Sequence, residues 1–377
     1  MRILIPLILL AACGTGGEAA QGNAAPAARA ARPFTVRQIT MFDEPWAMAF
    51  LPGPGPRALV TERKGKLKLL WSDVGRVGDV AGAPAVDYGG QGGFGDVVLH
   101  PRFAQNRLVY LSWVEAGEGG NRGAVVGRAR FLEDGNRPRL EGLQIIYRQS
   151  PKLSGRGHFG HRIAFGPDGK LYISNGERQE FTPAQDMNAN LGKIVRLNDD
   201  GTVPADNPFA RRGGVTAQIW SLGHRNPLGL AFDGSGRLWE IEMGPKGGDE
   251  LNLVERGRNY GYPIVSNGDH YDGKDIPDHP TRPEFAAPRV WWTPVISPGD
   301  MIVYSGSAFP SWRGDILVAG LSSKALIRVD VNGANAREAE RWDMGKRIRV
   351  VEQGPGGSVY LLEDGEGGRL LKLIPSK

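Results

Sequence analysis

Cysteine and dense charge are the two features that this chain most clearly lacks. Its 377 residues include one cysteine, Cys13, so no intramolecular disulfide can form and the fold needs none. The net charge is +5, but lysine and arginine are interleaved with aspartate and glutamate, and no block of five or more like charges occurs. Nucleic-acid binding needs a denser basic patch. The sequence therefore excludes a disulfide scaffold and argues against a nucleic-acid partner.

Long apolar runs are missing as well. The N-terminal run Ile3–Ala12 is far shorter than the ~20 apolar residues that a membrane-spanning helix needs. With Arg2 in front of it, this run is typical of a secretory signal, and we expect residues 1–12 to be a signal peptide. Leu10–Cys13 resembles the bacterial lipobox, whose cysteine is lipidated and becomes the N-terminus after cleavage. A plain signal peptide with an incidental cysteine is the alternative.

A lipidated, flexible tether is expected next, over residues 13–33. This segment is rich in alanine and glycine and has no periodic apolar face. The lipid on Cys13 would be the chain's membrane contact, and Gly14, in place of aspartate, favours release to an outer membrane. We therefore expect an exported, periplasmic protein of a bacterial cell envelope, anchored by lipid to the outer membrane, with a folded part that begins near Phe34.

Glycine and proline, in contrast, are abundant. The 55 glycines and 27 prolines stand beside nine tryptophans and 40% hydrophobic residues, so the chain is folded and its glycines and prolines separate many short elements. No stretch keeps a helical period over three turns. One pattern recurs six times: an apolar strand, a turn with Gly, Asp or Pro, and a second strand of alternating character. The copies begin at Met48, Val97, Ile163, Leu230, Ala308 and Val350.

These six units predict an all-β fold, a six-bladed β-propeller with long inter-blade loops that forms a single domain over residues 34–377. Radial repetition hides the strand edges that an open sheet would expose. A two-sheet sandwich is the simpler alternative. On a propeller the polar, glycine-rich loops would converge at one mouth of the central channel, where sites on this architecture usually lie.

Two histidines precede the third unit, in GHFGH. In an extended chain, residues three apart point to opposite faces, so His158 and His161 are a poor pair of metal ligands and only one of them is expected to face the channel. A histidine there is a competent general base if a carboxylate orients its other nitrogen, and Glu177 lies at the far end of the same hairpin. A structural imidazole is the alternative for either histidine.

Two further motifs carry candidate chemistry. In GHRNPLG, Arg225 and Asn226 offer a guanidinium and an amide to an oxyanion or a carbonyl oxygen, or tie down the loop. In MGPKGGDELN, the carbonyls of Gly244 and Pro245 and the carboxylate of Glu250 are hard ligands of the kind that calcium prefers. A solvated acidic turn is the alternative for the second motif.

Three cations lie on the last two units. Lys324 is one, and Arg347 and Arg349 are two residues apart, so on a strand the two arginines share a face and could clamp one polyanionic ligand. Surface arginines held in salt bridges are the alternative.

Together these motifs resemble the glucose/sorbosone dehydrogenase family of soluble aldose sugar dehydrogenases, which use pyrroloquinoline quinone (PQQ) on a six-bladed propeller. The resemblance runs from about Phe34 to the C-terminus. Its strongest blocks are GGQGGFGDVVLHPRF, GHFGHRIAFGPDGKLYISNGER, AQDMNANLGKIVRLNDDGTVPADNPF and IWSLGHRNPLGLAFDGSGRLWEIEMGPKGGDELNLVERGRNYGYP.

The resemblance implies an enzyme that oxidises the anomeric carbon of aldose sugars, or related alcohols, to lactones and passes the electrons to an external acceptor. It makes His158 the base, with Glu177 as its orienting carboxylate, and Arg225 the group that stabilises charge on the quinone oxygen. Gln91 and Asn226 would line the cofactor and substrate pocket.

The resemblance also implies how the cofactors are held. Lys324, Arg347 and Arg349 would grip the carboxylates of PQQ. Gly244 and Pro245 would hold a Ca²⁺ beside the cofactor, and Glu250 with the Tyr260 region resembles a second, structural calcium site. The sequence leaves open the identity of the sugar, the acceptor, and whether the chain forms a homodimer.

Four positions depart from the family pattern. His161 stands where a glycine is usual, and Glu177 where an aspartate is usual. Met243 and Leu228 replace polar residues near the cofactor or the sugar. These apolar replacements favour an alternative function, a non-catalytic propeller that binds a protein or a glycan. A calcium-dependent lactone hydrolase is a third reading, and it is disfavoured because the site offers mainly cations and backbone ligands.

Overall fold

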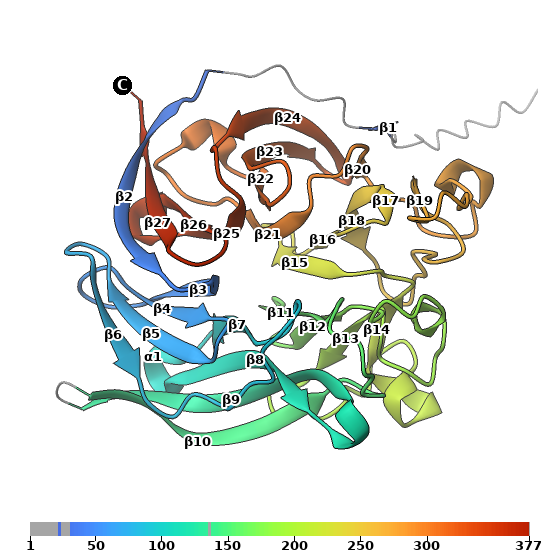
Figure 1. Ribbon diagram of the computed structural model, residues 1–377, viewed down its shortest axis with the longest axis horizontal. Coiled ribbons are helices and arrows are strands. Elements are labelled where there is room, and N and C mark those ends of the chain that lie inside the picture. The colour runs from blue at the N-terminus through green and yellow to red at the C-terminus, as the bar shows by residue number, and fades with distance from the viewer. Residues whose placement is uncertain (1–21, 24–30, 135–136, 377) are drawn as a thin grey trace, which may run out of the picture.

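Six sheets, each built on four antiparallel strands, surround a central channel, as Figure 1 shows. The computed structural model describes residues 22–23, 31–134 and 137–376. Each of the six repeats found in the sequence lies in a different sheet, so the predicted all-β, six-bladed propeller is confirmed and the sandwich alternative is wrong. The expected signal peptide, and the expected tether apart from residues 22–23 and 31–33, lie outside the described residues.

The strands of each blade follow one another along the chain from the channel outward. The first three blades comprise β3 (Pro45–Leu51), β4 (Arg57–Glu62), β5 (Lys66–Trp71) and β6 (Arg76–Val80); β7 (Phe94–Leu99), β8 (Leu108–Ala116), β9 (Arg122–Asp134) and β10 (Arg137–Arg148); and β11 (Gly160–Phe165), β12 (Leu171–Asn175), β13 (Lys193–Leu197) and β14 (Ile219–Leu222). The fourth and fifth comprise β15 (Pro227–Phe232), β16 (Leu238–Glu242), β18 (Asp249–Val254) and β20 (Val290–Trp292); and β21 (Pro298–Val303), β22 (Ile316–Gly320), β23 (Ala325–Asn332) and β24 (Asn335–Asp343).

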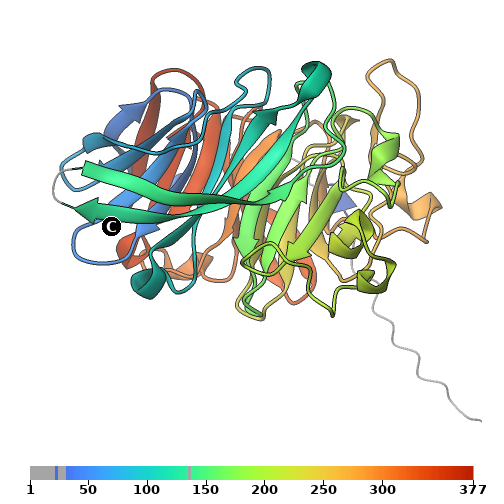
Figure 2. The ribbon, with the colours of Figure 1, turned by 90° about the horizontal axis from the view of Figure 1, so that it is seen from below.

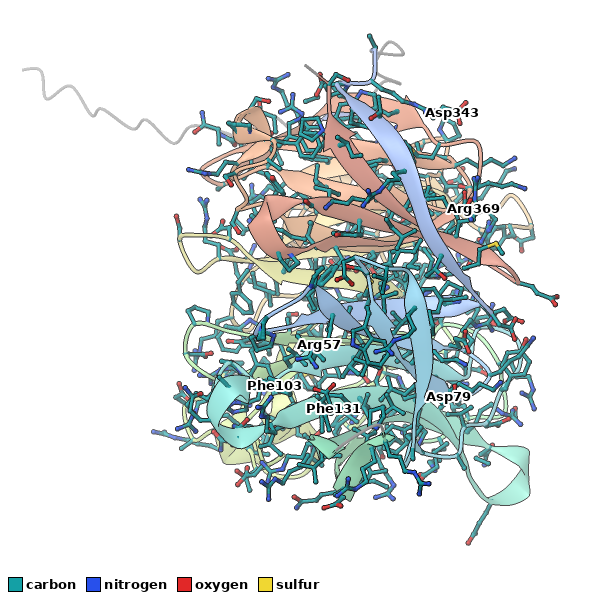
Figure 3. The ribbon with its side chains drawn as sticks, turned by 90° about the vertical axis from the view of Figure 1, so that its left-hand side faces the viewer. Arg57, Asp79, Phe103, Phe131, Asp343 and Arg369 are labelled. Carbon is teal, nitrogen blue, oxygen red and sulfur yellow. The ribbon has the colours of Figure 1, made fainter. Side chains whose placement is uncertain are left out.

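The sixth blade joins the two ends of the folded chain. Its inner strands are β25 (Ile348–Gln353), β26 (Val359–Glu363) and β27 (Gly368–Pro375), and its outer strand is β2 (Phe34–Phe42). Figure 3 shows β2 crossing the outside of this blade, where Met41 pairs with Arg369 of β27. The ring of blades is therefore closed by backbone hydrogen bonds between the first and last strands, which removes an open edge.

Each pair of neighbouring blades buries its own hydrophobic cluster. Leu59 and Leu111 lie in the cluster between the first two blades, and Val60 and Leu362 lie in the cluster between the first blade and the last. All four side chains have no exposed surface. Because inner strands from adjacent blades pack in this way around the whole ring, the positions at the strand ends that face the channel are fixed relative to one another.

Helices are few and short in the described part of the chain. The α-helix there is α1 (Phe103–Asn106), and none of the helices has the length and apolar character to cross a membrane. Single 3₁₀ turns occupy Glu118–Gly120, Thr182–Ala184, Ala210–Arg212, Val215–Gln218, His279–Thr281, Pro310–Trp312 and Pro355–Gly357. Two further short pairings occur, β17 (Lys246–Gly247) with β19 (Gly268–Asp269), and β1 (Gly22–Asn23) with β20.

The longest excursion from the blades is the segment between β18 and β20. Seen edge-on in Figure 2, its yellow-to-orange loops extend beyond the disc of blades. This segment supplies Tyr262, His270 and Tyr271 to the site described below. The inter-blade loops predicted from the sequence therefore build part of the site.

Candidate active site

Two adjoining cavities lie where the innermost strands begin. The basic cavity has a volume of about 240 Å³ and is lined by Trp46, Arg63, Gly90, Gln91, Phe159, Gly160, His161, Asn226, Leu228, Met243, Leu321, Arg347, Arg349 and Asp364. The histidine cavity has a volume of about 210 Å³ and is lined by His158, Glu177, Gln179, Phe181, Arg225, Pro245, Tyr262, His270, Tyr271 and Asp272. The consecutive residues Arg225 and Asn226 line one cavity each, so the two spaces are neighbours.

His158 is held at two points in the wall of the histidine cavity. Its backbone N–H donates to Oε1 of Gln91 at 2.8 Å, and its Nδ1 lies 2.5 Å from Oε1 of Glu177. The other carboxylate oxygen of Glu177 accepts the backbone N–H groups of Glu180 and Phe181, which fixes the carboxylate in turn. Nδ1 is thus engaged, and Nε2 is the ring nitrogen left for a ligand.

The buried position of His158 keeps its ring neutral. Burial lowers the pKa of His158; the contact with Glu177 opposes that shift, and the charge of Arg225 adds to it. A histidine with a lowered pKa stays unprotonated at neutral pH and can accept a proton. The pair therefore has the geometry of a general base and its orienting carboxylate.

Arg225 places a guanidinium in the same cavity. Its Nη1 donates to the carbonyl oxygens of Met243 at 2.9 Å and Gly244 at 2.5 Å, and its Nε donates to the hydroxyl of Tyr262 at 3.3 Å. Its backbone N–H donates to the buried carboxylate of Glu242 at 2.5 Å. The guanidinium is thus fixed by backbone and aromatic contacts, and its positive charge faces the cavity that His158 lines.

Arg347 and Arg349 lie at the start of β25, and both line the basic cavity, as the shared strand face predicted. One carboxylate bridges them: Nε of Arg347 lies 2.8 Å and Nε of Arg349 lies 2.9 Å from Asp364. Burial alone would raise the pKa of Asp364, but the two arginines together hold it below its usual value. The arginines are therefore salt-bridged and also line the cavity, and the binding of a polyanionic ligand between them stays a prediction.

Asn226 and Gln91, which the family resemblance implied would line the cofactor and substrate pocket, lie in the wall of one cavity. Both line the basic cavity, and Gln91 also holds the backbone of His158. The carbonyl oxygen Oδ1 of Asn226 is buried and has no hydrogen-bond partner in the described part of the chain. A buried polar atom without a partner costs stability, so this oxygen marks a position where a bound group can complete the site.

Two expectations differ from the structure. Lys324 is exposed in the turn between β22 and β23 and does not line either cavity. The Gly244 carbonyl, expected to bind calcium, accepts a hydrogen bond from Arg225, while its N–H donates to Asp249 at 2.8 Å. Burial raises the pKa of Asp249 to about 7. Neither the position of Lys324 nor the contacts of Gly244 could be predicted from the sequence, because both depend on how separate loops pack together.

The assumption of an extended chain at GHFGH is wrong. His158 and His161 have φ values of 47° and 58°, in the left-handed region, so the chain turns instead of running straight. His158 consequently lines one cavity and His161 the other. The prediction that only one of them could face the channel does not hold.

Glu250 and Tyr260 line a third, very small cavity of about 10 Å³, together with Glu242. The ring of Tyr260 stacks on His224, and its hydroxyl donates to the carbonyl of Leu253 at 2.6 Å, so the hydroxyl is already engaged. This volume is close to that of one water-sized particle. Two buried carboxylates around it suit a small cation.

A cluster of buried acids next to this small cavity was missed by sequence reasoning. His224, Glu240 and Glu242 bring ligand atoms within 4.8 Å of one another. Burial, followed by the neighbouring charge of Glu242, raises the pKa of Glu240 well above its usual value. The sequence does contain a signal for this cluster, because Glu240 and Glu242 are two residues apart and so lie on one face of a strand. Glu250 lies on the same face of the paired strand, but no single sequence motif contains all three residues.

Other missed residues come from the first blade and from the loops. Arg63 and Trp46 line the basic cavity from the ends of β4 and β3, and Phe181, Tyr262 and Tyr271 form an aromatic rim around the histidine cavity. Tyr271 is 74% exposed and Phe181 is 43% exposed. Exposed aromatic side chains in a polar loop are the signal that could have identified the rim.

Fold and cavities together define the class of protein: a six-bladed propeller whose channel carries, at one end, a histidine paired with a carboxylate, a fixed guanidinium and a basic cavity. The family model described as Glucose / Sorbosone dehydrogenase matches residues 42–372. The chain belongs to the glucose/sorbosone dehydrogenase family, and the resemblance drawn from its motifs is confirmed.

Known proteins extend this finding. Aldose sugar dehydrogenase YliI of Escherichia coli (strain K12) is 40% identical over 355 residues, which cover 92% of this chain and 94% of that protein. The crystal structure of the soluble aldose sugar dehydrogenase from Escherichia coli in the apo-form matches with a TM-score of 0.84 and 39% identity, covering 91% of this chain and 100% of that chain. The PQQ-bound form of an aldose sugar dehydrogenase from Streptomyces coelicolor matches with a TM-score of 0.74 and 29% identity, covering 92% and 99%.

Proposed function

We propose that this protein is a PQQ-dependent dehydrogenase that oxidises the anomeric carbon of aldose sugars to lactones and hands the electrons to an external acceptor. The observation that carries the proposal is the His158–Glu177 pair, 2.5 Å apart, in a cavity that also contains Arg225 and adjoins the basic cavity. Family membership supports sugar oxidation and the quinone cofactor.

The chain's own residues divide the work of the reaction. Neutral His158 accepts the proton of the sugar's anomeric hydroxyl at Nε2, and Glu177 stabilises the imidazolium that results. When bound, PQQ supplies a quinone that takes up the hydride from C1. Arg225 offers a fixed positive charge where negative charge develops, a contribution that can reach ~3 to 4 kcal/mol for one donor.

The basic cavity fits the cofactor in charge and in hydrogen bonding. Arg63, Arg347 and Arg349 bring three guanidinium groups, which suit the carboxylates of PQQ better than any neutral lining would. The buried Oδ1 of Asn226, which has no partner in the described residues, is a further position to be completed by a bound group. We assign the cofactor to this cavity for these reasons.

The two expected calcium sites differ in how well they fit. At Gly244 and Pro245, Arg225 already occupies the Gly244 carbonyl, so this arrangement does not suit a second cation there, and no step in our mechanism uses one. At the small cavity, Glu242, Glu250 and Tyr260 line a space for one small particle. We propose that the second site binds Ca²⁺ and that its role is structural.

The aromatic rim supports a sugar as the substrate. Phe181 and Tyr271 present ring surface to solvent at the entrance to the histidine cavity, while Asp272 supplies a carboxylate there. A pyranose has one apolar C–H face and a ring of hydroxyls, so it can pack on an aromatic ring and still donate hydrogen bonds.

A second candidate function is a non-catalytic propeller that binds a protein or a glycan. Leu228 and Met243 favour it, since both line the basic cavity and both pack with the hydrophobic cluster of the first two blades, narrowing the polar surface. The pairing of a neutral histidine with a buried carboxylate is what makes the catalytic function the better supported of the two.

One titration separates these functions. Purified apoprotein is titrated with PQQ, with and without Ca²⁺ and with EDTA as the control, while cofactor absorbance and dye reduction by a panel of aldoses are followed. Stoichiometric binding with sugar-dependent dye reduction is the expected result. Absence of PQQ binding would overturn the dehydrogenase and turn attention to a protein or glycan ligand.

We also propose that the protein is exported and held in the cell envelope by a lipid on Cys13. The motif Leu10–Cys13 supports this location. Membrane fractionation of the wild type and of Cys13→Ala tests it: the wild type should sediment with the outer membrane and the variant should not. A wild type found entirely in the soluble fraction would contradict the anchor.

A further inference from the structure

His161 occupies a backbone position that suits glycine. Its φ of 58° lies in the left-handed region, where a branched or bulky side chain costs of order 1 kcal/mol or more. Gly160 before it also has a positive φ, of 67°. The imidazole also requires a glycine beside it, because a Cβ on Gly95 would lie only 2.0 Å from Cε1 of His161. A side chain kept under strain in a wall of the basic cavity calls for a physical reason.

The ring of His161 is locked in place by stacking. It lies parallel to Trp46, with ring centroids 4.9 Å apart and an interplanar angle of 17°, and edge-on to Phe159 at 6.4 Å. Trp46 is itself fixed, because the guanidinium of Arg162 lies 3.9 Å from its ring. His161 is only 2% exposed, and both stacked residues line the basic cavity. The pair is therefore a rigid part of the cavity wall.

A buried serine decides which nitrogen of His161 carries the hydrogen. Oγ of Ser112 accepts the backbone N–H of Asp96 at 2.7 Å and lies 2.8 Å from Nδ1 of His161. Ser112 is fully buried, and Nδ1 is the one acceptor that its hydroxyl hydrogen meets among the described residues. The hydroxyl therefore donates to Nδ1, which leaves the hydrogen of the neutral imidazole on Nε2.

The imidazole stays neutral over the whole working pH range. Burial, and after it the charges of Arg162, Arg178 and Arg63, lowers the pKa of His161 to about 3. Nε2 has no hydrogen-bond partner in the described part of the chain, so a donor is left over in the wall of a cavity that otherwise offers guanidinium groups and amides.

We propose that His161 is a cofactor-binding residue of this chain: stacked on Trp46, it presents a ring edge and an Nε2–H donor to the quinone cofactor held in the basic cavity. The inference rests on the proposed function, because it assigns PQQ to that cavity. It also explains the strain, since a glycine would fit the backbone but would supply neither the ring nor the donor.

Two variants separate the ring from the donor. His161→Gly suits the local backbone and removes both, and it should raise the Kd for PQQ about tenfold. His161→Phe keeps a ring and removes the donor, and it should raise the Kd less, by about threefold. Because the wild-type ring is neutral, the ratio between variant and wild type should be the same at pH 5.5 and at pH 8.

The measurement is a PQQ titration of apoprotein followed by quenching of tryptophan fluorescence, with the melting temperature of each apoprotein recorded in parallel. Weaker PQQ binding by His161→Gly, with an unchanged or raised melting temperature, supports the inference. Equal PQQ affinity in wild type and His161→Gly would overturn it and leave the proposed function intact. Failure of the wild type to bind PQQ would overturn both.

Discussion

The two ends of the central channel differ in charge more than in size. The acidic cavity, at the end where the innermost strands finish, has a volume of about 460 Å³ and is lined by Asp96, Asp300 and Glu352 with Arg162. The basic cavity at the other end is smaller, about 240 Å³, and brings three arginines together with Asp364. An anionic quinone therefore has one favourable end. Charge, and not volume, identifies the site.

One pair of consecutive residues separates the two ends. His161 lines the basic cavity and Arg162 the acidic one. Arg162 donates to the carbonyls of Leu228 at 2.8 Å and Gly299 at 2.7 Å, and its Nη1 lies 3.4 Å from Asp96. A single buried guanidinium thus neutralises part of the acidic end and braces the wall of the basic end. The same fold therefore places acidic groups at one end of the channel and basic groups at the other.

The variant with the largest expected effect removes the proposed base, His158. His158→Ala should lower turnover by about 10²- to 10⁴-fold, because it removes the ring nitrogen that Glu177 orients to accept the proton, while PQQ still binds. His270→Ala is the matched control, since His270 lines the same cavity and its ring forms no hydrogen bond with Glu177. Steady-state rates with saturating PQQ measure both. Full activity in His158→Ala would show that the base lies elsewhere.

The orienting carboxylate gives a smaller effect with a pH signature. Glu177→Gln should lower turnover by on the order of 10²-fold, since the amide holds the ring less well in its reactive form. Burial already lowers the pKa of His158 from 6.5, and the base is active when unprotonated, so the acid limb of the wild-type profile should lie below pH 6.5. Glu177 raises that pKa, so the limb should move to still lower pH in the variant. An acid limb unmoved by Glu177→Gln would mean that the carboxylate does not act on His158.

How much of this site the sequence predicted depends on how local each contact is. The turn at Pro167–Gly169 predicted the hairpin of β11 and β12, and pairing of Gly160 with Asn175 brings His158 and Glu177 together. The His158–Glu177 pair could therefore be predicted from this one hairpin motif. The repeat pattern and turn residues were likewise enough to predict six blades.

Contacts that depend on closure of the ring could not be predicted. Trp46 and Arg63 come from an ordinary hairpin of the first blade, and they reach the basic cavity because β2 joins the last blade. The alternation of apolar and polar residues in β2 does not indicate that β27 is the strand with which it pairs. The left-handed turns at His158 and His161 were missed because the segment was taken as extended, although histidine adopts positive φ more often than most residues other than glycine do.

A binding test sharpens the contrast between the two ends. Arg349→Ala should weaken PQQ binding about 10- to 100-fold, because a charge-assisted hydrogen bond contributes about 1.5 to 3 kcal/mol and Asp364 loses a partner. Arg337→Ala, an exposed arginine on β24, is the matched control. Glu352→Gln at the acidic end should leave the Kd unchanged. A larger loss from Glu352→Gln than from Arg349→Ala would reverse the assignment of the cofactor's end.

The smallest expected effect is on stability, at the acidic end. Burial, with the charges of Asp300 and Asp96 after it, raises the pKa of Glu352 well above 4.5. As pH rises above 4.5, the unfolded chain releases this proton and the folded chain keeps it, so the free energy of unfolding falls as pH rises and levels off above the folded pKa.

Glu352→Gln removes that dependence. The variant should match the wild type near pH 4 and exceed its free energy of unfolding by about 1 kcal/mol at pH 8, since each unit of pKa shift corresponds to about 1.4 kcal/mol before solvent in the cavity screens it. Urea unfolding of the apoproteins at both pH values measures this difference, with the exposed Glu366→Gln as a control for the same change of charge. Equal stability of variant and wild type at pH 8 would mean that folding does not raise the pKa of Glu352, and that its carboxylate contributes a full negative charge to the acidic end at neutral pH, which would repel the cofactor more strongly than we infer.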